Sequence, residues 1–429
     1  MKLAQIMLIV ASMLTACTGS LEPPNPVLLV VGYSSGAGSR VALIRDRFGE
    51  SGAVTEQLEF LPGSVRNLPA PAVDYDVTNR DRARDRLVVL SRGPAAAGQA
   101  TGYLTFFSLQ SIDPDNPVAF EQRAEFTISP ATVTNIPDTL LNPGFCPARV
   151  QVTQNGSFVT VLNEPTLCNG RGQPSIDIFS LAGAQPRLLQ RLTTGGAEDG
   201  GVGGGSFLAT GGNLYLSQSP TQDLLYYAVS VPGGLRLEQA TLPRPGAGFG
   251  LDDELPVSAV ARVRTDPRQG NLVDLGRAGA SGDERLVVLF EAGLANVEFA
   301  AEPLEDDVVP TATLSDNSFV IRDDRRETDA TLFVGTPAAQ RFSYVPVATD
   351  EGTVAAPENA RVDAVDAVIE PTFGFVYFVA PGQVSIFDLS AYDVGERLRN
   401  PRAVSVPELG DTVPSFVTWT QAAPPATPQ

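Results

Sequence analysis

One pattern recurs between residues 27 and 407 and restricts the folds open to this chain. A short, nearly continuous apolar run is followed by a run of alternating polarity and, in several units, by a more polar third run. The apolar runs after the first unit span residues 86–91, 158–162, 213–217, 285–290, 331–334 and 375–379. Runs of this length, bounded by turn-forming residues, predict strands that are buried on both faces.

The punctuation of these runs argues against long helices, because 35 prolines and 40 glycines interrupt the chain. Repeated units of four short strands instead predict an all-β fold, a β-propeller of four-stranded blades. We count blades by the cores of their second strands, which are Leu28, Leu87, Val159, Leu214, Leu286, Leu332 and Val376. The count is seven, with six to eight left open because the unit at 257–314 is the least regular. A pair of β-sandwiches is the alternative fold.

The two ends of the repeating region fit together. The first unit opens directly at its second strand, residues 27–31, and the last run, residues 413–420, has no partners after it. We therefore predict that the last run is the inner strand of blade one, which closes the ring and removes an open edge. The propeller then covers residues 27–420, and residues 421–429 form a disordered, proline-rich tail.

These strand pairs resemble the lactonase-like and YVTN-type seven-bladed propellers of exported bacterial proteins. The resemblance is carried above all by residues 149–181, with the Asn155-Gly156 hairpin turn. It covers nearly the whole chain after residue 26 and is architectural, without a family catalytic motif. It implies a fold and no residue roles, because propellers serve enzymes, receptors and scaffolds alike.

The N-terminal residues predict where the protein is located. Lys2 precedes an apolar segment, residues 3–13, that is too short to span a bilayer. The motif Leu14-Thr15-Ala16-Cys17 resembles the lipobox of bacterial lipoproteins. The resemblance implies a signal peptide at 1–16, acylation of Cys17 and anchoring to the lipid bilayer through its acyl chains. An ordinary secretory signal is the alternative.

The segment that follows predicts how and where the protein is held. Residues 17–26 form a linker, and its nine residues after Cys17 reach at most about 30 Å when extended. Thr18 provides no aspartate retention signal. In a Gram-negative organism this predicts the cell envelope, with anchoring at the outer membrane.

Composition limits the chemistry. The chain has no histidine, and Lys2 is its only lysine, so the mature chain has neither an imidazole nor a side-chain amine. This excludes Ser-His-Asp, Cys-His and Ser-Lys catalysis, Schiff-base chemistry and histidine metal sites. The formal charge of −19 argues against a nucleic-acid partner.

The remaining two cysteines predict a disulfide. With Cys17 acylated, Cys146 and Cys168 are an even pair in an exported protein. A hairpin that turns at 155–156 pairs Val150 with Val161 and places Cys146 opposite Pro165, close to Cys168. We expect the bond to stiffen the loops around it. Two free thiols are the alternative.

Propeller geometry predicts a rim of loops on one face, formed by residues 129–147, 163–174, 194–205 and 243–256. Two acidic clusters would neighbour each other there, formed by Glu198, Asp199, Asp252, Asp253 and Glu254. Carboxylates suit a calcium ion, or acid–base chemistry when two lie about 5 to 9 Å apart. A solvated acidic loop is the alternative, and no other cofactor is expected.

Other motifs favour structural roles. Residues 32–36 match a nucleophile-elbow pattern, but Ser34 has no histidine to activate it, and a hairpin loop is predicted. The glycine-rich stretch 195–205 lacks the end of a phosphate-binding loop and predicts a flexible link. Residues 113–116 predict a turn. The alternating Arg80, Arg82, Arg84 and Arg86 are expected to pair with neighbouring aspartates.

Three functions remain open. The first is a non-enzymatic, lipid-anchored propeller that binds a protein or carbohydrate partner through its loop rim. The second is a carboxylate-based hydrolase or lyase acting on sugars or lactones, with Asp252, Asp253 or Glu198 as candidates. The third is an outer-membrane assembly scaffold, which would resemble the propeller lipoprotein of the β-barrel insertion machinery.

Overall fold

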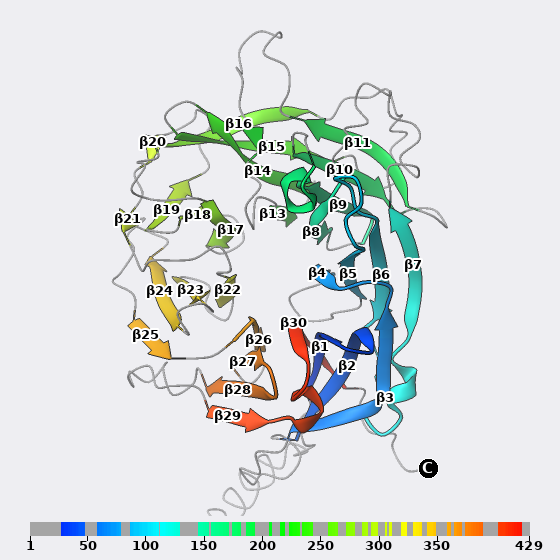
Figure 1. Cartoon of the computed structure of the whole chain (residues 1–429). Helices are drawn as coiled ribbons and strands as arrows, with labels where there is room; N and C mark the ends of the chain where they lie inside the picture. The colour runs from blue at the N-terminus through cyan, green and yellow to red at the C-terminus, as the bar shows by residue number, and fades with distance from the viewer. Residues whose placement is uncertain are drawn as a thin grey trace, which may run out of the picture.

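The strands are arranged in a ring in the computed structural model (Figure 1). The structure describes residues 27–47, 58–78, 86–110, 112–128, 145–153, 156–170, 174–181, 186–193, 206–207, 215–218, 223–231, 234–242, 256–264, 272–278, 285–290, 293–298, 305–306, 309–310, 319–323, 329–336, 341–348, 358–361, 364–370, 374–388 and 402–422. Within these ranges the secondary structure consists of β-strands and three short 3₁₀ helices, with no α-helix. None of their helices is long and apolar enough to cross a membrane.

The first three sheets come mainly from the first half of the chain, and the strands of each follow one another from the centre of the ring outward. Sheet 1 contains β30 (Val413–Gln421), β1 (Val27–Ser35), β2 (Gly38–Asp46) and β3 (Leu58–Leu68). Sheet 2 contains β4 (Ala72–Val77), β5 (Arg86–Arg92), β6 (Gly102–Ser108) and β7 (Gln122–Ile128). Sheet 3 contains β8 (Pro147–Val152), β9 (Phe158–Asn163), β10 (Ser175–Ser180) and β11 (Arg187–Thr193).

Sheet 4 contains β12 (Ser206–Phe207) and β13 (Tyr215–Gln218), both paired with β14 (Asp223–Val231), then β15 (Gly234–Thr241), β16 (Val257–Arg264) and β20 (Glu305–Asp306). Sheet 5 contains β17 (Leu272–Ala278), β18 (Arg285–Phe290), β19 (Gly293–Glu298) and β21 (Val309–Pro310). Sheet 6 contains β22 (Phe319–Asp323), β23 (Asp329–Thr336), β24 (Arg341–Ala348) and β25 (Glu358–Arg361). Sheet 7 contains β26 (Asp366–Glu370), β27 (Phe375–Ala380), β28 (Gln383–Asp388) and β29 (Arg402–Ser405). The 3₁₀ helices are η1 (Pro117–Ala119), η2 (Pro165–Cys168) and η5 (Pro407–Leu409).

This arrangement confirms the predicted all-β propeller. The described strands form seven sheets, and the number of blades in the complete ring stays a prediction. The second strands β5, β9 and β27 are buried almost throughout, as their continuous apolar runs predict. The outer strand β7 is largely exposed and polar, which suits an edge that must not pair with another chain.

The predicted closure of the ring is also confirmed. Strand β30 pairs antiparallel with β1 from Val27–Gln421 at one end to Ser34–Val413 at the other. The C-terminal strand thus completes the sheet that the N-terminal strand begins. The strand extends to Gln421, and Ala422 is buried and bridges Ile112. The prediction that the tail begins at residue 421 is therefore wrong for Gln421 and Ala422, and residues 423–429 lie outside the described residues.

The assignment of strands within sheet 4 differs from the prediction. Residues 213–217 were expected to form its second strand, but β13 lies at the inner edge and β14 is second. Strand β16, expected to start the next blade, pairs with β15 instead. The runs that form β13 and β14 are both apolar, and their long-range pairing decides which strand is central.

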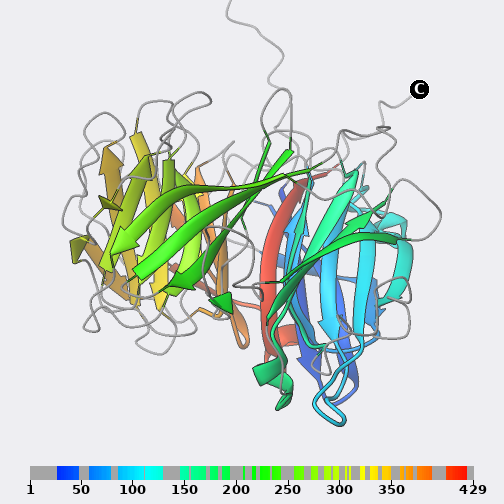
Figure 2. The ribbon, with the colours of Figure 1, turned by 90° about the horizontal axis from the view of Figure 1, so that it is seen from above.

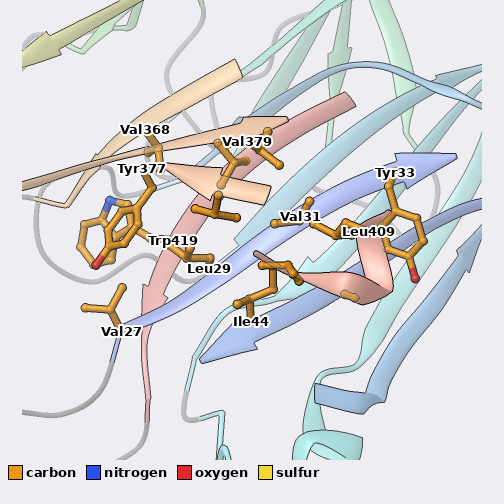
Figure 3. Packing of buried hydrophobic residues seen from close by; sticks show 14 of the residues in the cluster. Val27, Leu29, Val31, Tyr33, Ile44, Val368, Tyr377, Val379, Leu409 and Trp419 are labelled. Atoms are coloured by element: carbon orange, nitrogen blue, oxygen red, sulfur yellow. The ribbon is translucent and has the colours of Figure 1, made fainter. Parts of the chain in front are cut away.

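The seam between sheets 1 and 7 shows how the ring is held closed (Figure 3). Trp419 of β30 packs with Leu29 and Val31 of β1 and with Tyr377 of β27, and all four are buried. Burial of large apolar side chains contributes about 1.5 to 3 kcal/mol each. The Tyr377 hydroxyl donates a 2.6 Å hydrogen bond to Asp46 of β2, so a polar contact also crosses the seam.

Candidate functional site

The strands have two ends, and their loops divide between two faces of the ring. We call the end that contains Val27 and Gln421, which pair with each other, the terminal face. The other end of sheet 1 is the hairpin turn at Gly36–Ala37, between β1 and β2. We call the loops at that end of sheets 2 and 3, residues 93–101, 145–146 and 164–170, the disulfide rim.

Among the loops on this side that join the second and third strands of a sheet, those of sheets 2 and 3 are the longest. The equivalent turns of sheets 1 and 7 are the two-residue Gly36–Ala37 and Pro381–Gly382. In sheets 2 and 3 the chain instead runs through residues 93–101 and 164–174 before the next strand begins. Figure 2 shows η2 and the loop before β6 projecting from the same end of the strands. The rim therefore stands above its neighbours at these two sheets.

The disulfide lies within this raised part. Cys146 and Cys168 are bonded, with their Cα atoms 6.0 Å apart, so the predicted pairing is confirmed. The sulfur atoms are buried against Ala100 of the neighbouring loop. The bond joins the connection that leads into β8 to the loop that follows β9.

The predicted register of the hairpin that leads to the disulfide is correct at Val150 and wrong at Cys146. Val150 lies opposite Val161, as predicted. A β-bulge at Ala148 then shifts the pairing, and the N–H of Glu164 donates a 2.8 Å hydrogen bond to the carbonyl of Cys146. Cys146 therefore faces Glu164 and not Pro165, because the bulge places an extra residue on β8.

The short helix η2 brings Cys168 back toward Cys146. The Glu164 carboxylate caps its start by accepting hydrogen bonds from the N–H and the hydroxyl of Thr166, at 3.1 and 2.5 Å. Asn169 ends the helix in the left-handed conformation, with φ of 57°. Glu164 is buried while Leu167 is 54% exposed. The helix thus hides its capping acid and presents an apolar side chain to solvent.

The two raised loops touch each other. The loop 93–101 turns at Ala97 and Gly98, which both have positive φ, with Ala96 paired to Gln99. A Cβ atom on Gly98 would lie 2.9 Å from the Cα of Gly170. Backbone packs directly against backbone at this point, so the loops of sheets 2 and 3 form one surface.

Arg92, the last residue of β5, also binds the segment that leads into β8. Its guanidinium donates to the carbonyl of Pro147 at 3.2 Å and contacts the sulfur of Cys146 at 3.6 Å. Burial lowers the pKa of Arg92. The N–H of Ala100 donates to the carbonyl of Phe145 at 2.8 Å. These bonds join sheet 2 to the strand entry of sheet 3 beside the disulfide.

The inner strands hold a second group of polar side chains. Asp74 of β4 accepts a 2.7 Å hydrogen bond from the N–H of Val150, and Asp76 accepts a 2.8 Å bond from that of Val152. Asp366 of β26 accepts a 2.9 Å bond from the N–H of Val417. Each carboxylate therefore binds the backbone of the next inner strand and clamps neighbouring sheets together.

Burial changes the acidity of two of these clamps. It raises the pKa of Asp366 to about 6, although hydrogen bonds from the N–H groups of Val417 and Ala367 and the nearby Tyr75 hydroxyl act in the opposite direction. It also raises the pKa of Asp74, against the lowering effect of Arg149. The guanidinium of Arg149 lies 3.4 Å from the Asp74 carboxylate. An acid with a raised pKa is suited to proton transfer only if it reaches a substrate.

The other predicted site residues fall largely outside the described ranges. These are Cys17, Glu198, Asp199, Asp252, Asp253, Glu254 and the arginines Arg80, Arg82 and Arg84. The part of the chain that the structure describes has no group of three side chains suited to hold a metal ion. The calcium hypothesis stays a prediction.

The flanking strands nevertheless correct one prediction about the acidic loops. Segment 194–205 leads into β12, whose Ser206 pairs with Ser230 of β14. Segment 243–256 follows β15, whose Thr241 pairs with Leu224, at the other end of β14. The six residue steps between Leu224 and Ser230 correspond to about 20 Å. The two segments therefore join sheet 4 at opposite ends and not on one shared rim.

Two predicted turns are confirmed. The Asp113 carboxylate accepts a 2.9 Å hydrogen bond from the N–H of Asp115, and the Asp113 carbonyl accepts one from Asn116. Ser34 is the last residue but one of β1, beside a hairpin turn, and its hydroxyl lies 2.9 Å from that of Ser39. The nucleophile-elbow pattern is thus part of a β-hairpin.

No protein-family model matches the chain, and the comparison with curated proteins finds no match. Among solved structures, the periplasmic gluconolactonase PpgL of Pseudomonas aeruginosa is similar, with a TM-score of 0.61 and 13% identity over 93% of this chain and 100% of that one. A functionally unknown protein from Desulfotomaculum acetoxidans gives a TM-score of 0.52 and 11% identity over 92% and 99%. Identity this low shows the fold alone, which is a propeller of lactonase-like architecture.

Proposed function

We propose that this chain is a lipid-anchored lipoprotein of the cell envelope that binds a protein or carbohydrate partner through the disulfide rim and catalyses no reaction. The construction of the rim carries the proposal. Its two raised loops are joined by a disulfide, by close backbone packing at Gly98 and by the bonds of Arg92. A surface that is rigid before binding loses less conformational freedom when a partner binds.

The chemistry of the described side chains supports binding over catalysis. The carboxylates Asp74, Asp76, Asp177 and Asp366 accept hydrogen bonds from neighbouring strands or side chains, which is a structural use. Histidine is absent from the sequence, and lysine is absent after Lys2. A disulfide agrees with an exported location, because such bonds persist in oxidising compartments. One similar structure is also that of a periplasmic protein.

The test compares two charge insertions at exposed apolar positions. Leu167→Glu changes the rim, while Val118→Glu, at a residue that is 64% exposed within η1, is the matched control. Acylated protein carrying each change is cross-linked in native membranes, purified and analysed by mass spectrometry. An array of envelope glycans is probed with the same variants. Loss of a wild-type partner with Leu167→Glu alone supports the proposal, and equal capture by both variants contradicts it.

A lactone or sugar hydrolase is the second candidate function. The raised pKa of Asp366, near Asp74, is the observation that favours it. The comparison with a gluconolactonase adds no residue role. Purified protein is assayed for hydrolysis of aldonolactones, with Asp366→Asn as the variant. Hydrolysis that Asp366→Asn abolishes would favour the enzyme, and recovery of outer-membrane assembly proteins in the cross-linking experiment would favour the scaffold hypothesis.

A further inference from the structure

The path of the chain decides which end of the propeller a membrane anchor would hold. Val27, the first described residue, lies on the terminal face, where it pairs with Gln421 on one side and Asp46 on the other. Any tether that precedes Val27 therefore reaches the propeller on this face. The C-terminal strand also ends there, so both ends of the folded ring lie on one face.

The disulfide rim lies at the other end of the strands. In sheet 2 it follows Arg92, which pairs with Gly102, whereas the opposite end of the same strands is Arg86 paired with Ser108. The carbonyl of Leu109, just beyond Ser108, accepts a 2.7 Å hydrogen bond from Thr420 near the terminal face. The nine residues of β1 correspond to about 30 Å, so the two faces are separated by roughly that height.

The linker matches this height only when it is fully extended. Residues 18–26 reach at most about 30 Å at full extension. To bring the disulfide rim to the bilayer, the linker would have to run straight along the whole length of the strands. Three of the nine linker residues are prolines, which favour an extended conformation of about 3.1 Å per residue, so the linker reaches roughly 28 Å and no further than the height of the strands. The terminal face is therefore favoured to lie next to the anchor.

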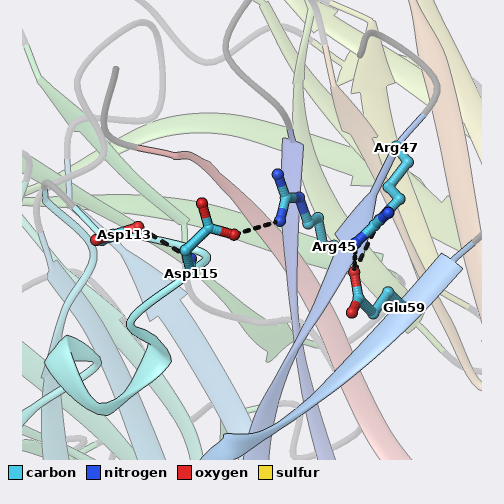
Figure 4. Close-up of polar contacts among 5 residues, drawn as sticks. All are labelled: Arg45, Arg47, Glu59, Asp113 and Asp115. Carbon is cyan, nitrogen blue, oxygen red and sulfur yellow. Dashed lines mark hydrogen bonds and ion pairs between the residues drawn. The ribbon is translucent and has the colours of Figure 1, made fainter. Parts of the chain in front are cut away.

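The terminal face carries side chains that suit a hydrated layer (Figure 4). Arg45 donates to Asp115 at 3.0 Å, and Arg47 donates to Glu59 at 2.8 Å. Within each pair the arginine and the carboxylate neutralise each other's charge, beside the start of β1. They present neither a basic patch that would bind anionic lipid nor an apolar surface that would insert.

We infer that the acylated chain is held with its terminal face next to the bilayer, so that the disulfide rim points away from the bilayer into the aqueous compartment. The inference rests on the proposed acylation of Cys17. The acyl chains supply the attachment, and the propeller places its raised loops about one strand length further from the lipid than the terminal face.

The test places one fluorophore on each face of the full, acylated chain in vesicles that contain headgroup spin-labelled phospholipid. Asp115→Cys labels the terminal face, where the Asp115 side chain is 82% exposed, and Ala95→Cys labels the exposed loop of the disulfide rim. Both native cysteines of the described chain are bonded to each other, so the introduced thiol reacts selectively. Loss of most fluorescence from the Asp115→Cys label, with little loss from the Ala95→Cys label, is the expected result.

Two outcomes separate the orientation from the anchor. Equal quenching of both labels, or stronger quenching of the Ala95→Cys label, on protein that floats with the vesicles overturns the orientation. Each label is also measured on a chain carrying Cys17→Ser, which should neither float with the vesicles nor be quenched. Flotation of that chain would overturn the proposed acylation and would leave the labels to report another mode of attachment.

Discussion

The carboxylate of Asp366 accepts a 2.9 Å hydrogen bond from the backbone N–H of Val417 and so ties the last sheet to the strand that closes the first. On the other side, the hydroxyl of Tyr75 donates a 2.8 Å bond to the carbonyl of Val417. Both polar backbone groups of one residue are thus bound by side chains from the two flanking sheets. The closing strand is held by these clamps as well as by its pairing with β1.

The clamp at Asp366 should make stability depend on pH. Its pKa is raised from 3.8 to about 6 in the folded protein, so the folded state favours the protonated acid. The stability that Asp366 contributes is therefore present below about pH 4 and is lost as the pH rises through about 6. One pKa unit is about 1.4 kcal/mol, so the loss amounts to at most about 3 kcal/mol.

Asp366→Asn removes this titration and keeps an oxygen that accepts the Val417 bond. Urea unfolding of both proteins at pH 4 and pH 7 measures the effect. We expect similar stabilities at pH 4 and a more stable variant at pH 7. The difference between the proteins cancels the other titrating groups. A difference that is the same at both pH values would show that Asp366 ionises normally.

Removal of the closing strand should unfold the ring. A chain truncated after Asp411 loses the buried Phe416 and Trp419, whose burial contributes about 1.5 to 3 kcal/mol each, and exposes the edge of β1. Because a domain is stable by only about 5 to 15 kcal/mol, we expect loss of cooperative thermal unfolding. Truncation after Ala422 is the control and should leave the midpoint unchanged. Equal midpoints for the two truncations would contradict the closure.

The sequence predicts strands well where burial determines them. The run predicted at 413–420 is strand β30, because its run of residues buried from Phe416 to Thr420 is local information. The inner edge of sheet 4 was misassigned because β13 and β14 are both apolar and their pairing partners lie elsewhere in the chain. The bulge at Ala148 changes the residue opposite Cys146 by one position. It could not be predicted either, because it depends on how β8 pairs with β9.

The clamps were missed by sequence reasoning. Asp74 and Asp366 look like ordinary polar positions within apolar strands, and their partners Val150 and Val417 are 76 and 51 residues away. A register shift precedes Asp74 on its strand, whereas none precedes Asp366. The residues Asp74, Arg149 and Asp274 each follow a register shift on an inner strand. Such a shift is visible only once the strands are paired.

The disulfide should stabilise the rim more than the core. Cys146 and Cys168 are 22 positions apart, and closing a loop of that size contributes about 3 kcal/mol in the chain-entropy account. Replacing both cysteines by alanine should lower the free energy of unfolding by about this amount. Amide hydrogen exchange should accelerate most in residues 164–170, which open locally, and in β27 by no more than the fall in the free energy of unfolding requires.

Alkylation under denaturing, non-reducing conditions checks the bond itself. Intact mass should show neither Cys146 nor Cys168 modified in the exported protein. Modification of both would mean that the thiols are free and that the loop after β9 is held by the Glu164 cap and the Arg92 contacts alone. Unchanged exchange in the double alanine variant would also contradict a stiffening role.

A buried ion pair in sheet 3 gives the last prediction. Arg191 contacts the fully buried Asp177 at 2.5 and 2.7 Å, and the amide of Asn163 donates to the same carboxylate at 2.9 Å. Asp177→Asn leaves the Arg191 cation buried without its counter-charge, which should cost about 3 to 5 kcal/mol. Adding Arg191→Met removes the stranded charge, so the double variant should recover much of that loss in urea unfolding. If Asp177→Asn alone is as stable as the wild type, the pair contributes no net stability, and the strand contacts of β10 alone hold the sheet together.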